Sequence, residues 1–215
     1  MENRKKDTVC LYAADISAMT AEDFDRLYRQ ASPGRRKRAD SCRNRDDAAR
    51  CLTAEALLRY ALDGAEFTVR TAPGGKPHIP ELPDFHYSLS HAGDWVVLAC
   101  GGNEVGVDAE RIREDTDVER FARRFFTTRE REYLLQSSDG VRCRFFEIWT
   151  KKESLGKFLG SGLGDPGKRE VFDLPPGVRF FPTEMAERYW LSLCTEGEKW
   201  EIRQVDVCVL GKNRL

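Results

Sequence analysis

The apolar and polar positions in the first part of the chain predict a strand followed by a helix. Residues 8 to 14 (TVCLYAA) are mostly apolar, which is typical of a buried strand. A helix is expected from about Thr20, because its hydroxyl precedes AEDF where an N-cap would stand. The triplet Ser32-Pro33-Gly34 then predicts a break in the chain.

A second helical pattern extends from Arg35 to Leu62. Apolar side chains recur in it at helical spacing, at Ala49, Leu52, Ala56 and Tyr60. We therefore predict one long helix with a strongly basic beginning, closed by Gly64. The segment from Thr71 to Phe85 (TAPGGKPHIPELPDF) is dense in proline and glycine and is expected to be mostly loop.

Two apolar runs flank the triplet Gly101-Gly102-Asn103 in WVVLACGGNEVGVDAE, and this pattern predicts a β-hairpin. Side chains alternate between the two faces of a strand. Val105 and Val107 therefore share one face, and Asp108 and Glu110 share the other. Both carboxylates are expected to project together.

The second half of the chain is predicted to contain two further helices and a second sheet. Thr127 and Glu130 have the spacing of a capping box ahead of a helix. Another helix is expected from about Arg142 to Leu159, ending in the glycine-rich GSGLG of residues 160–164. The remainder, Arg169 to Val209, alternates short apolar runs with turns and predicts the second sheet.

Composition narrows the class of protein. Of 215 residues, 33% are charged and 40% hydrophobic, which is typical of a folded globular protein. The formal net charge of -1 argues against a general nucleic-acid or membrane-surface binder. The cysteines include no C-x-x-C pair, so they indicate neither a zinc site nor a disulfide framework. Without a long apolar segment in MENRKKDTVCLYAADIS or later, a cytoplasmic location is expected.

Asp108 and Glu110 are the first candidates for chemistry. Two carboxylates held close together repel each other, and a bound cation relieves that repulsion. Mg²⁺ prefers oxygen ligands, takes one or two protein carboxylates and completes its shell with water and substrate phosphates. A D-x-E motif alone is a weak signal, however, and a solvated strand face is its more frequent meaning.

The predicted helix near residues 145–159 bears on that choice. Lys152 falls within its apolar stripe, while Trp149, Glu153 and Lys157 follow one another at intervals of four residues on an adjacent face. One interpretation is an ordinary Glu-Lys surface pair beside a lysine that reaches solvent. The other is a third metal ligand or base beside a phosphate-binding cation.

Basic residues cluster at the start of the long predicted helix: Arg35, Arg36, Lys37, Arg38, Arg43, Arg45 and Arg50. Such a run is usually a solvated face, and the alternatives are a nucleic-acid patch or a site for a phosphorylated small molecule. A lone histidine such as His91, or a lone lysine such as Lys76, is more often structural than catalytic. Ser90 beside His91 does not indicate a hydrolase, because adjacent residues seldom form a nucleophile-base pair.

Five motifs follow one another along the chain: GKPHIP, SLSHAGDWV, GVDAER, RRFFTTRE and WTKKESLGKFLGSGL. In this order they resemble the motifs of the 4′-phosphopantetheinyl transferases of the long, single-chain type that activates surfactin synthetase. The resemblance covers most of Ser32 to Leu163. It implies Mg²⁺-dependent transfer of 4′-phosphopantetheine from coenzyme A to a serine of an acyl or peptidyl carrier protein, with release of adenosine 3′,5′-bisphosphate.

The resemblance also implies an architecture. The fold would be α+β, with two similar halves, residues 1–104 and 105–215, related by a pseudo-twofold axis. Coenzyme A would lie in the cleft between these halves. Because the pair of halves already forms the cleft, a monomer is implied, with neither nucleic acid nor a membrane as partner.

Particular residues receive roles from the resemblance. Asp108, Glu110 and Glu153 match the family's metal ligands, and Glu153 is also the candidate base. Lys152 and Lys157 match the two lysines of its catalytic helix, with Lys157 as the phosphate-binding cation. The further residues expected to contact coenzyme A are Arg35, Arg38, Arg50, Lys76, Ser90 and His91.

One motif departs from the family pattern, and several rival functions stay open. The family often has Asn-x-Ser-His-Ser where this chain has SLSHA, residues 88–92. The carrier is expected to dock along Arg111 to Arg124 and the helix after it. The main alternative is a protein that binds coenzyme A or a carrier without turnover; a nucleic-acid-binding module and a metal-dependent phosphohydrolase are the others.

Overall fold

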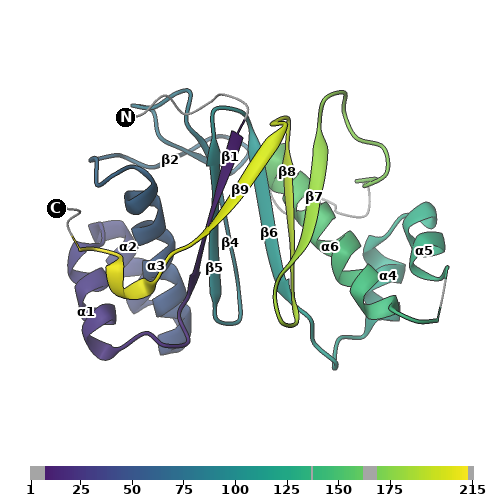
Figure 1. The fold of residues 1–215 in the computed structure, drawn as a ribbon, viewed down its shortest axis with the longest axis horizontal. Coiled ribbons are helices and arrows are strands. Elements are labelled where there is room, and N and C mark those ends of the chain that lie inside the picture. Colours follow the sequence, from purple (N-terminus) through teal and green to yellow (C-terminus); the bar gives the residue numbers. More distant parts are fainter. Residues whose placement is uncertain (1–7, 137, 162–168, 213–215) are drawn as a thin grey trace.

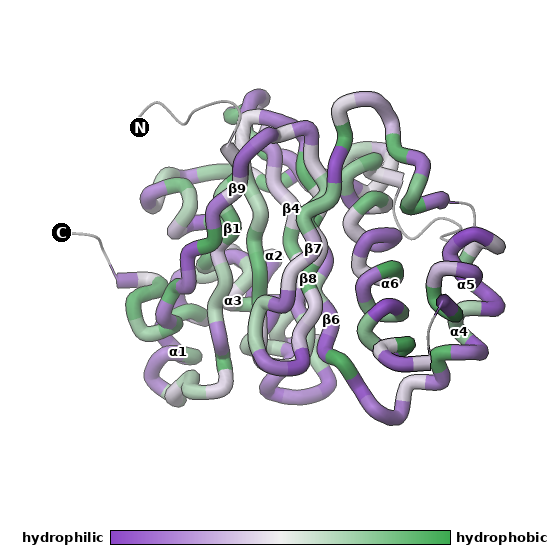
Figure 2. The backbone as a smooth tube through the Cα atoms, turned by 45° about the vertical axis from the view of Figure 1, so that its right-hand side comes forward, coloured by the Kyte–Doolittle hydropathy of each residue, from purple (hydrophilic) through white to green (hydrophobic). Residues whose placement is uncertain are grey.

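The computed structural model describes residues 8–136, 138–161 and 169–212. Their helices and strands form four layers: helices, a four-stranded sheet, a three-stranded sheet and further helices (Figure 1). The two sheets face each other in the middle of the molecule, where several strands are apolar (Figure 2). This is the mixed α+β class that the sequence predicts.

The strands of the first sheet are β1 (Thr8–Asp15), β4 (His86–Ala92), β5 (Trp95–Gly101) and β9 (Lys199–Gln204). They lie in the order β4-β5-β1-β9, with β1 antiparallel to β5 and parallel to β9. The predicted first strand is confirmed. The prediction that residues 169–209 form only a second sheet is wrong for β9, which returns to the first sheet and covers the otherwise open edge of β1.

Three helices cover the outer face of this sheet: α1 (Ala21–Gln30), α2 (Pro33–Asp40) and α3 (Arg45–Ala61). Thr20 caps α1 as predicted, in a reciprocal capping box. The single helix predicted from Arg35 to Leu62 is wrong, because the chain breaks between α2 and α3. Asn44 caps α3 by accepting a hydrogen bond from the Asp47 N–H at 2.8 Å. Such side-chain bonds to the backbone compete with a continuous helix.

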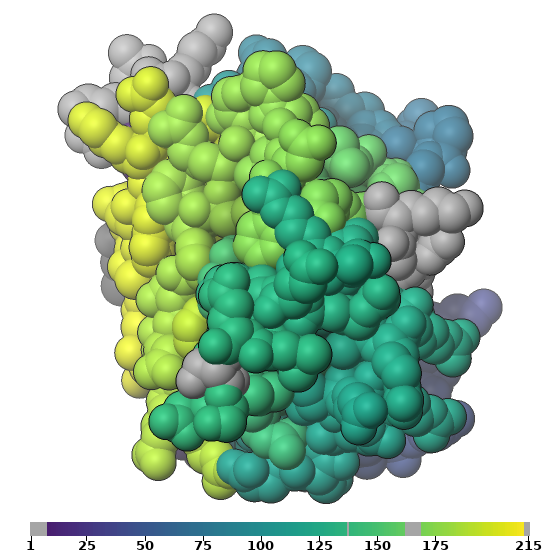
Figure 3. All heavy atoms as spheres, turned by 90° about the vertical axis from the view of Figure 1, so that its right-hand side faces the viewer, coloured from purple at the N-terminus to yellow at the C-terminus, as the bar shows by residue number. Residues whose placement is uncertain are grey.

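The strands of the second sheet are β6 (Val105–Arg111), β7 (Arg179–Ala186) and β8 (Tyr189–Thr195), in the order β6-β8-β7. The helices on its outer face are α4 (Val118–Phe125), α5 (Thr128–Leu134) and α6 (Val141–Phe158). Helices α4 and α5 form much of the surface on this side (Figure 3). The capping box of α5 and the position of α6 are confirmed, whereas residues 162–164 of the predicted GSGLG stop lie outside the described residues.

Minor elements complete the list. They are the short strands β2 (Arg70–Thr71) and β3 (Pro77–His78) and a 3₁₀ turn, η2 (Val207–Val209). The segment of residues 71–85 is otherwise loop, as predicted. Across the part of the chain that the structure describes, none of the helices has both the length and the apolar character needed to cross a bilayer.

Alternate residues of four strands fill the space between the sheets. The buried side chains of this layer include Val9, Leu11, Ala13, Val97, Ala99, Val105, Val107, Ala109, Leu191 and Leu193. The intervening residues of β1, such as Tyr12 and Ala14, pack instead with the helices of the first layer. Each buried Val or Leu contributes about 1.5–3 kcal/mol of transfer free energy, so this layer holds the two sheets together.

The hairpin predicted around residues 101–103 is wrong. β5 pairs with β4 and β1, while β6 pairs with β8, so the two apolar runs belong to different sheets. Glycine and asparagine indicate that the chain can turn, but they do not determine which distant strand the next run joins. The predicted alternation within β6 is confirmed: Val105 and Val107 face the layer between the sheets, and Asp108 faces α6.

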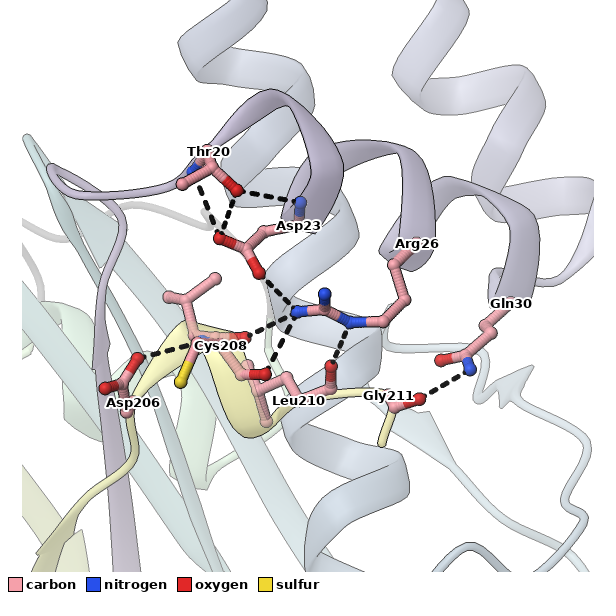
Figure 4. A network of polar contacts seen from close by, with 9 residues as sticks. Thr20, Asp23, Arg26, Gln30, Asp206, Cys208, Leu210 and Gly211 are labelled. Atoms are coloured by element: carbon pink, nitrogen blue, oxygen red, sulfur yellow. Dashed lines mark hydrogen bonds and ion pairs between the residues drawn. The ribbon is translucent and has the colours of Figure 1, made fainter. Parts of the chain in front are cut away.

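The C-terminal segment after β9 packs against α1 (Figure 4). Arg26 donates from Nε to the Leu210 oxygen at 3.0 Å and from Nη2 to the Cys208 oxygen at 3.1 Å. Gln30 Nε2 donates to the Gly211 oxygen at 2.6 Å. The segment after β9 therefore belongs to the same layer as α1, on the outer face of the first sheet.

Candidate active site

Helix α6 lies directly on strand β6 because Gly106 has no side chain. A Cβ atom on Gly106 would lie 2.0 Å from the Ser154 oxygen and 2.5 Å from the Phe158 nitrogen. A larger residue would push the helix away from the strand. The close approach brings the face of β6 that carries Asp108 and Glu110 against α6.

Asp108 lies at the centre of this contact and is only 5% exposed. Its Oδ1 atom accepts hydrogen bonds from Lys157 Nζ at 2.7 Å and from Ser90 Oγ at 2.9 Å. Its Oδ2 atom is buried and has no hydrogen-bond partner within the described residues. A buried polar atom without a partner raises the free energy of the folded state. Oδ2 is therefore suited to bind a metal cation from outside the polypeptide.

Two further carboxyl groups lie close enough to Asp108 to respond to its charge. Burial and the charge of Asp108 raise the pKa of Glu110 to about 7, although a hydrogen bond from Trp149 Nε1 at 3.3 Å opposes the shift. Burial and Asp108 also raise the pKa of Glu153, and Lys157 opposes that shift. The three acids predicted from the sequence therefore share one electrostatic environment.

These acids fit a hard divalent cation in charge and ligand type. In their present side-chain positions, the described residues form no cluster of three or more His, Cys, Asp or Glu groups that could hold a metal. Lys157 supplies positive charge instead, since its Nζ bonds to Asp108 Oδ1 and to the Val107 oxygen at 2.9 Å. The unpartnered Asp108 Oδ2 and the raised carboxyl pKa values indicate that this compensation is incomplete.

Lys152 contacts a different acid. Its side chain is fully buried, and Nζ donates to Glu130 Oε1 and Oε2 at 2.8 and 2.7 Å and to the Arg169 oxygen. Glu130 also accepts from the N–H groups of Thr127 at 2.8 Å and Val171 at 3.1 Å. Burial lowers the pKa of Lys152, and Glu130 opposes that shift. The pair ties α5 and the segment at Arg169 to α6.

The basic residues of α2 and α3 occupy varied positions. Arg35 Nε lies 3.4 Å from Glu55 Oε2, and Arg38 is exposed. Arg50 Nη1 donates to the Gly93 oxygen at 2.6 Å and so holds the turn between β4 and β5. Partial loss of surrounding water, together with the charges of Arg50 and Lys157, lowers the pKa of His91. His91 is therefore near enough to Arg50 and Lys157 for both positive charges to affect its pKa.

Lys76 ties the loop of residues 71–85 to β6 and α6. Its Nζ forms an ion pair with Glu104 and donates to the Val105 oxygen at 3.2 Å and the Phe158 oxygen at 2.9 Å. A cavity of about 220 Å³ adjoins it. The residues that line this cavity are Gly75, Lys76, Pro77, Tyr87, Ser88, Leu89, Gly156, Lys157 and Gly160. Two of the cations predicted to bind one ligand, Lys76 and Lys157, therefore share a cavity.

Several contacts of the site are not indicated by the sequence pattern. Glu130 is recognisable only as a helix cap, and nothing in its spacing identifies it as the partner of Lys152. The bond between Ser90 and Asp108 joins strands of different sheets, which no local pattern encodes. The spacing places Trp149 on the same helix face as Glu153, but it does not indicate the bond from Trp149 Nε1 to Glu110.

Comparison with known proteins gives the family of the chain. The family model described as the 4′-phosphopantetheinyl transferase superfamily matches residues 104–205. The chain is similar to 4′-phosphopantetheinyl transferase Sfp of Bacillus subtilis (strain 168), with 34% identity over 155 residues, or 69% of this chain and 68% of that protein. The chain belongs to the 4′-phosphopantetheinyl transferase superfamily. The resemblance predicted from its motifs is therefore confirmed.

Two other relatives agree with the assignment of the chain to this superfamily. 4′-Phosphopantetheinyl transferase psf-1 of Bacillus pumilus is 38% identical over 165 residues, 71% of this chain and 70% of that protein. The L-aminoadipate-semialdehyde dehydrogenase-phosphopantetheinyl transferase of Xenopus laevis is 31% identical over 144 residues, 61% of this chain and 47% of that protein. Asp108, Glu110, Glu153 and Lys157 of the transferase all fall within the segment that the family model matches.

Proposed function

We propose that this transferase moves 4′-phosphopantetheine from coenzyme A to a serine hydroxyl of an acyl or peptidyl carrier protein and releases adenosine 3′,5′-bisphosphate. Membership of the superfamily supports the reaction. The observation that carries the proposal is the contact of Lys157 with Asp108 beside two acids of raised pKa, Glu110 and Glu153. Transfer of a phosphoryl group to a hydroxyl requires such a set of positioned charges.

The same acids are the proposed ligands of a Mg²⁺ ion. Asp108, Glu110 and Glu153 would hold it, and the buried, unpartnered Oδ2 of Asp108 supports this assignment. The ligand set consists of oxygen atoms, which suits Mg²⁺ better than a softer metal. When bound, the ion would neutralise charge on the pyrophosphate of coenzyme A.

The protein's own residues would handle the proton and the phosphate oxygens. The carrier serine oxygen forms a bond to the phosphorus that bears pantetheine, and the bond from that phosphorus to the oxygen of the departing nucleotide phosphate breaks. Glu153, which is near enough to Asp108 and Lys157 for both charges to affect its pKa, would accept the serine proton. Lys157, whose side chain is 32% exposed, would donate to a phosphate oxygen.

The cavity shared by Lys76 and Lys157 is our candidate for part of the coenzyme A cleft. Arg50 would extend the cationic surface beside Lys157, whereas His91, whose pKa is lowered, would contribute a neutral imidazole that can donate one N–H. Arg38 and Arg35 would extend the cationic surface along α2. Several fixed cations suit coenzyme A, because its pyrophosphate and 3′-phosphate present separate negative charges.

We further propose that residues 1–104 and 105–215 are two similar halves related by a pseudo-twofold axis. The order β1-α1-α2-α3-β4-β5, apart from the short pair β2-β3, parallels the order β6-α4-α5-α6-β7-β8. The strand orders β4-β5-β1 and β7-β8-β6 correspond in the same way, which supports the relationship. β9 and the segment after it would be an addition from the second half to the first. A single chain would then complete the cleft as a monomer.

Contacts support proposals for the remaining expected roles. Lys152 would position α6 and not touch substrate, because Glu130 and the Arg169 oxygen engage its ammonium group. The carrier would dock along Arg111 to Arg124, which includes most of α4, and along α5, on the face shown in Figure 3. Phe121 of α4 is 41% exposed and stacks edge-on with Trp149, which bonds to Glu110.

The buried thiols Cys51 and Cys194 suit a reducing compartment such as the cytoplasm.

The intact mass of an apo carrier protein, after incubation with the transferase and coenzyme A, tests the proposed function. The expected result is the gain of one phosphopantetheine group with Mg²⁺ and no gain with EDTA, together with an equal amount of adenosine 3′,5′-bisphosphate. No gain on several unrelated carriers by a folded sample would instead favour binding of coenzyme A or a carrier without turnover. Cleavage of coenzyme A in the absence of a carrier would indicate a phosphohydrolase.

A further inference from the structure

Two serines join the sheets where β4 and β6 lie side by side (Figure 1). Ser88 Oγ accepts a hydrogen bond from the Val107 N–H at 3.1 Å, and Ser90 Oγ accepts from the Ala109 N–H at 3.3 Å. The two strands belong to different sheets, so these hydroxyls take the place of a backbone ladder. We call this pair of contacts the serine seam.

Ser90 makes one contact that Ser88 does not. Its hydroxyl donates to Asp108 Oδ1 at 2.9 Å, whereas Ser88 hydrogen-bonds, within the described ranges, to the backbone of β6 alone. Both serines are buried. Ser90 therefore holds the N–H of Ala109 and the carboxylate of the preceding residue, Asp108, with one hydroxyl group.

We infer that Ser90 is a positioning residue for Asp108, an inference that rests on the proposed metal-dependent transfer. Ser90 and Lys157 reach the same oxygen, Oδ1, from two different elements, β4 and α6. Together they fix the carboxylate in one orientation and leave Oδ2 for the cation. The hydroxyl of Ser90, in residues 1–104, thus orients the proposed metal ligand Asp108, in residues 105–215.

The seam also supplies its own control. Loss of the Ser90 hydroxyl removes a seam bond and frees the Asp108 carboxylate to rotate, and loss of a residue that orients a metal ligand costs about 10- to 100-fold in metal affinity. Loss of the Ser88 hydroxyl removes a comparable seam bond but no bond to a carboxylate. Ser88→Ala therefore reproduces the structural effect of Ser90→Ala without the effect on Asp108.

The test measures Mn²⁺ binding to the full chain by electron paramagnetic resonance, without coenzyme A or carrier, because Ser88 lines the cavity proposed for coenzyme A. Ser90→Ala is expected to raise the Kd for Mn²⁺ by about tenfold or more, and Ser88→Ala by less than about twofold. Ser90→Thr, which keeps the hydroxyl, is expected to restore most of the affinity. Thermal midpoints of the two alanine variants are expected to fall by similar amounts.

Equal Mn²⁺ affinities in the two alanine variants would overturn the inference, as would wild-type protein that does not bind Mn²⁺. A raised KM for coenzyme A with unchanged Mn²⁺ affinity would overturn it in favour of a direct contact. If Ser90→Ala does not fold, Ser90→Cys decides, because a thiol keeps the size of the side chain but donates weakly; wild-type affinity in it overturns the inference. If the wild-type protein binds Mn²⁺ but leaves the carrier unmodified, the proposed function is wrong and the inference about Ser90 still stands.

Discussion

The Nζ atom of Lys157 lies 2.7 Å from Oδ1 of Asp108 and 2.9 Å from the backbone oxygen of Val107. This contact joins the C-terminal part of α6 to β6. It places a cation against a buried carboxylate, yet the Lys157 side chain keeps part of its surface exposed. Lys157 can therefore offset the charge of Asp108 and still line the adjoining cavity that we propose for coenzyme A.

Replacement of Lys157 tests this double role. Lys157→Met is expected to lower kcat/KM for transfer by about 100-fold or more, because a cation aimed at the phosphate is lost. Steady-state transfer to a carrier at saturating Mg²⁺ measures the change. Lys151→Met is the control, since Lys151 pairs with Glu147 at 2.5 Å, and its loss is expected to change the rate by less than about fivefold. Similar rates in the two variants would contradict the assignment.

Glu153 is the proposed base, and Glu153→Gln keeps its shape while removing its ability to accept a proton. We expect the single-turnover rate with bound coenzyme A to fall by about 10²- to 10⁴-fold. Glu147→Gln, on the same helix and bonded to Tyr133 and Lys151, is the control. A Glu153→Gln rate within tenfold of wild type, roughly 1.4 kcal/mol in activation free energy, would assign the proton to another group.

The two faces that form the site could be predicted because each depends on a local period. Asp108 and Glu110 lie two residues apart on a strand, and Glu153 and Lys157 lie four apart on a helix, so each pair shares a face. Their meeting depends on Gly106, whose missing side chain lets α6 lie on β6. A glycine at that point in a strand is compatible with such an approach, but the sequence does not say which helix makes it.

Contacts between distant segments could not be predicted in this way. Lys152 is recognisable as a lysine in an apolar stripe, but its burial is possible only because Glu130 of α5 meets it. The strong local signal at residues 101–103 predicts a hairpin, yet β6 pairs with β8, far along the chain. The break at Asn44 shows that one capping side chain can divide a segment whose apolar periodicity predicts a single helix.

The close packing at Gly106 makes a prediction about stability and activity together. Gly106→Ala is expected to destabilise the fold by about 1–3 kcal/mol, because the added methyl group must displace α6 from β6. Transfer activity is expected to fall with it, since the same shift separates Lys157 from Asp108. Denaturant unfolding and the carrier mass assay measure the two effects. Gly34→Ala is the control, because a Cβ there meets nothing within 4 Å; equal stabilities would contradict the packing argument.

Glu55 links α3 to the beginning of α2 and makes the stability of the fold sensitive to acid. Its Oε1 accepts from the Ser32 N–H at 2.7 Å and its Oε2 from the Ser32 hydroxyl at 2.8 Å. Arg35 and Arg59 lie 3.4 and 3.3 Å from its carboxylate. Burial acts to raise the pKa of Glu55, but the Ser32 hydrogen bonds and the two arginines outweigh it, so the pKa lies below its ordinary value of 4.5.

Because the folded-state pKa of Glu55 is below the unfolded-state value, its ionised form stabilises the fold fully above pH 4.5, and that contribution is lost as the pH falls through the folded-state pKa. Glu55→Gln is therefore expected to lower the thermal midpoint near neutral pH and to flatten its decline below pH 4.5. Thermal unfolding of both proteins from about pH 7 to about pH 3 measures this. Glu119→Gln, which removes an exposed pair with Arg123, is expected to follow wild type. A Glu55→Gln curve parallel to wild type would contradict the role of Glu55.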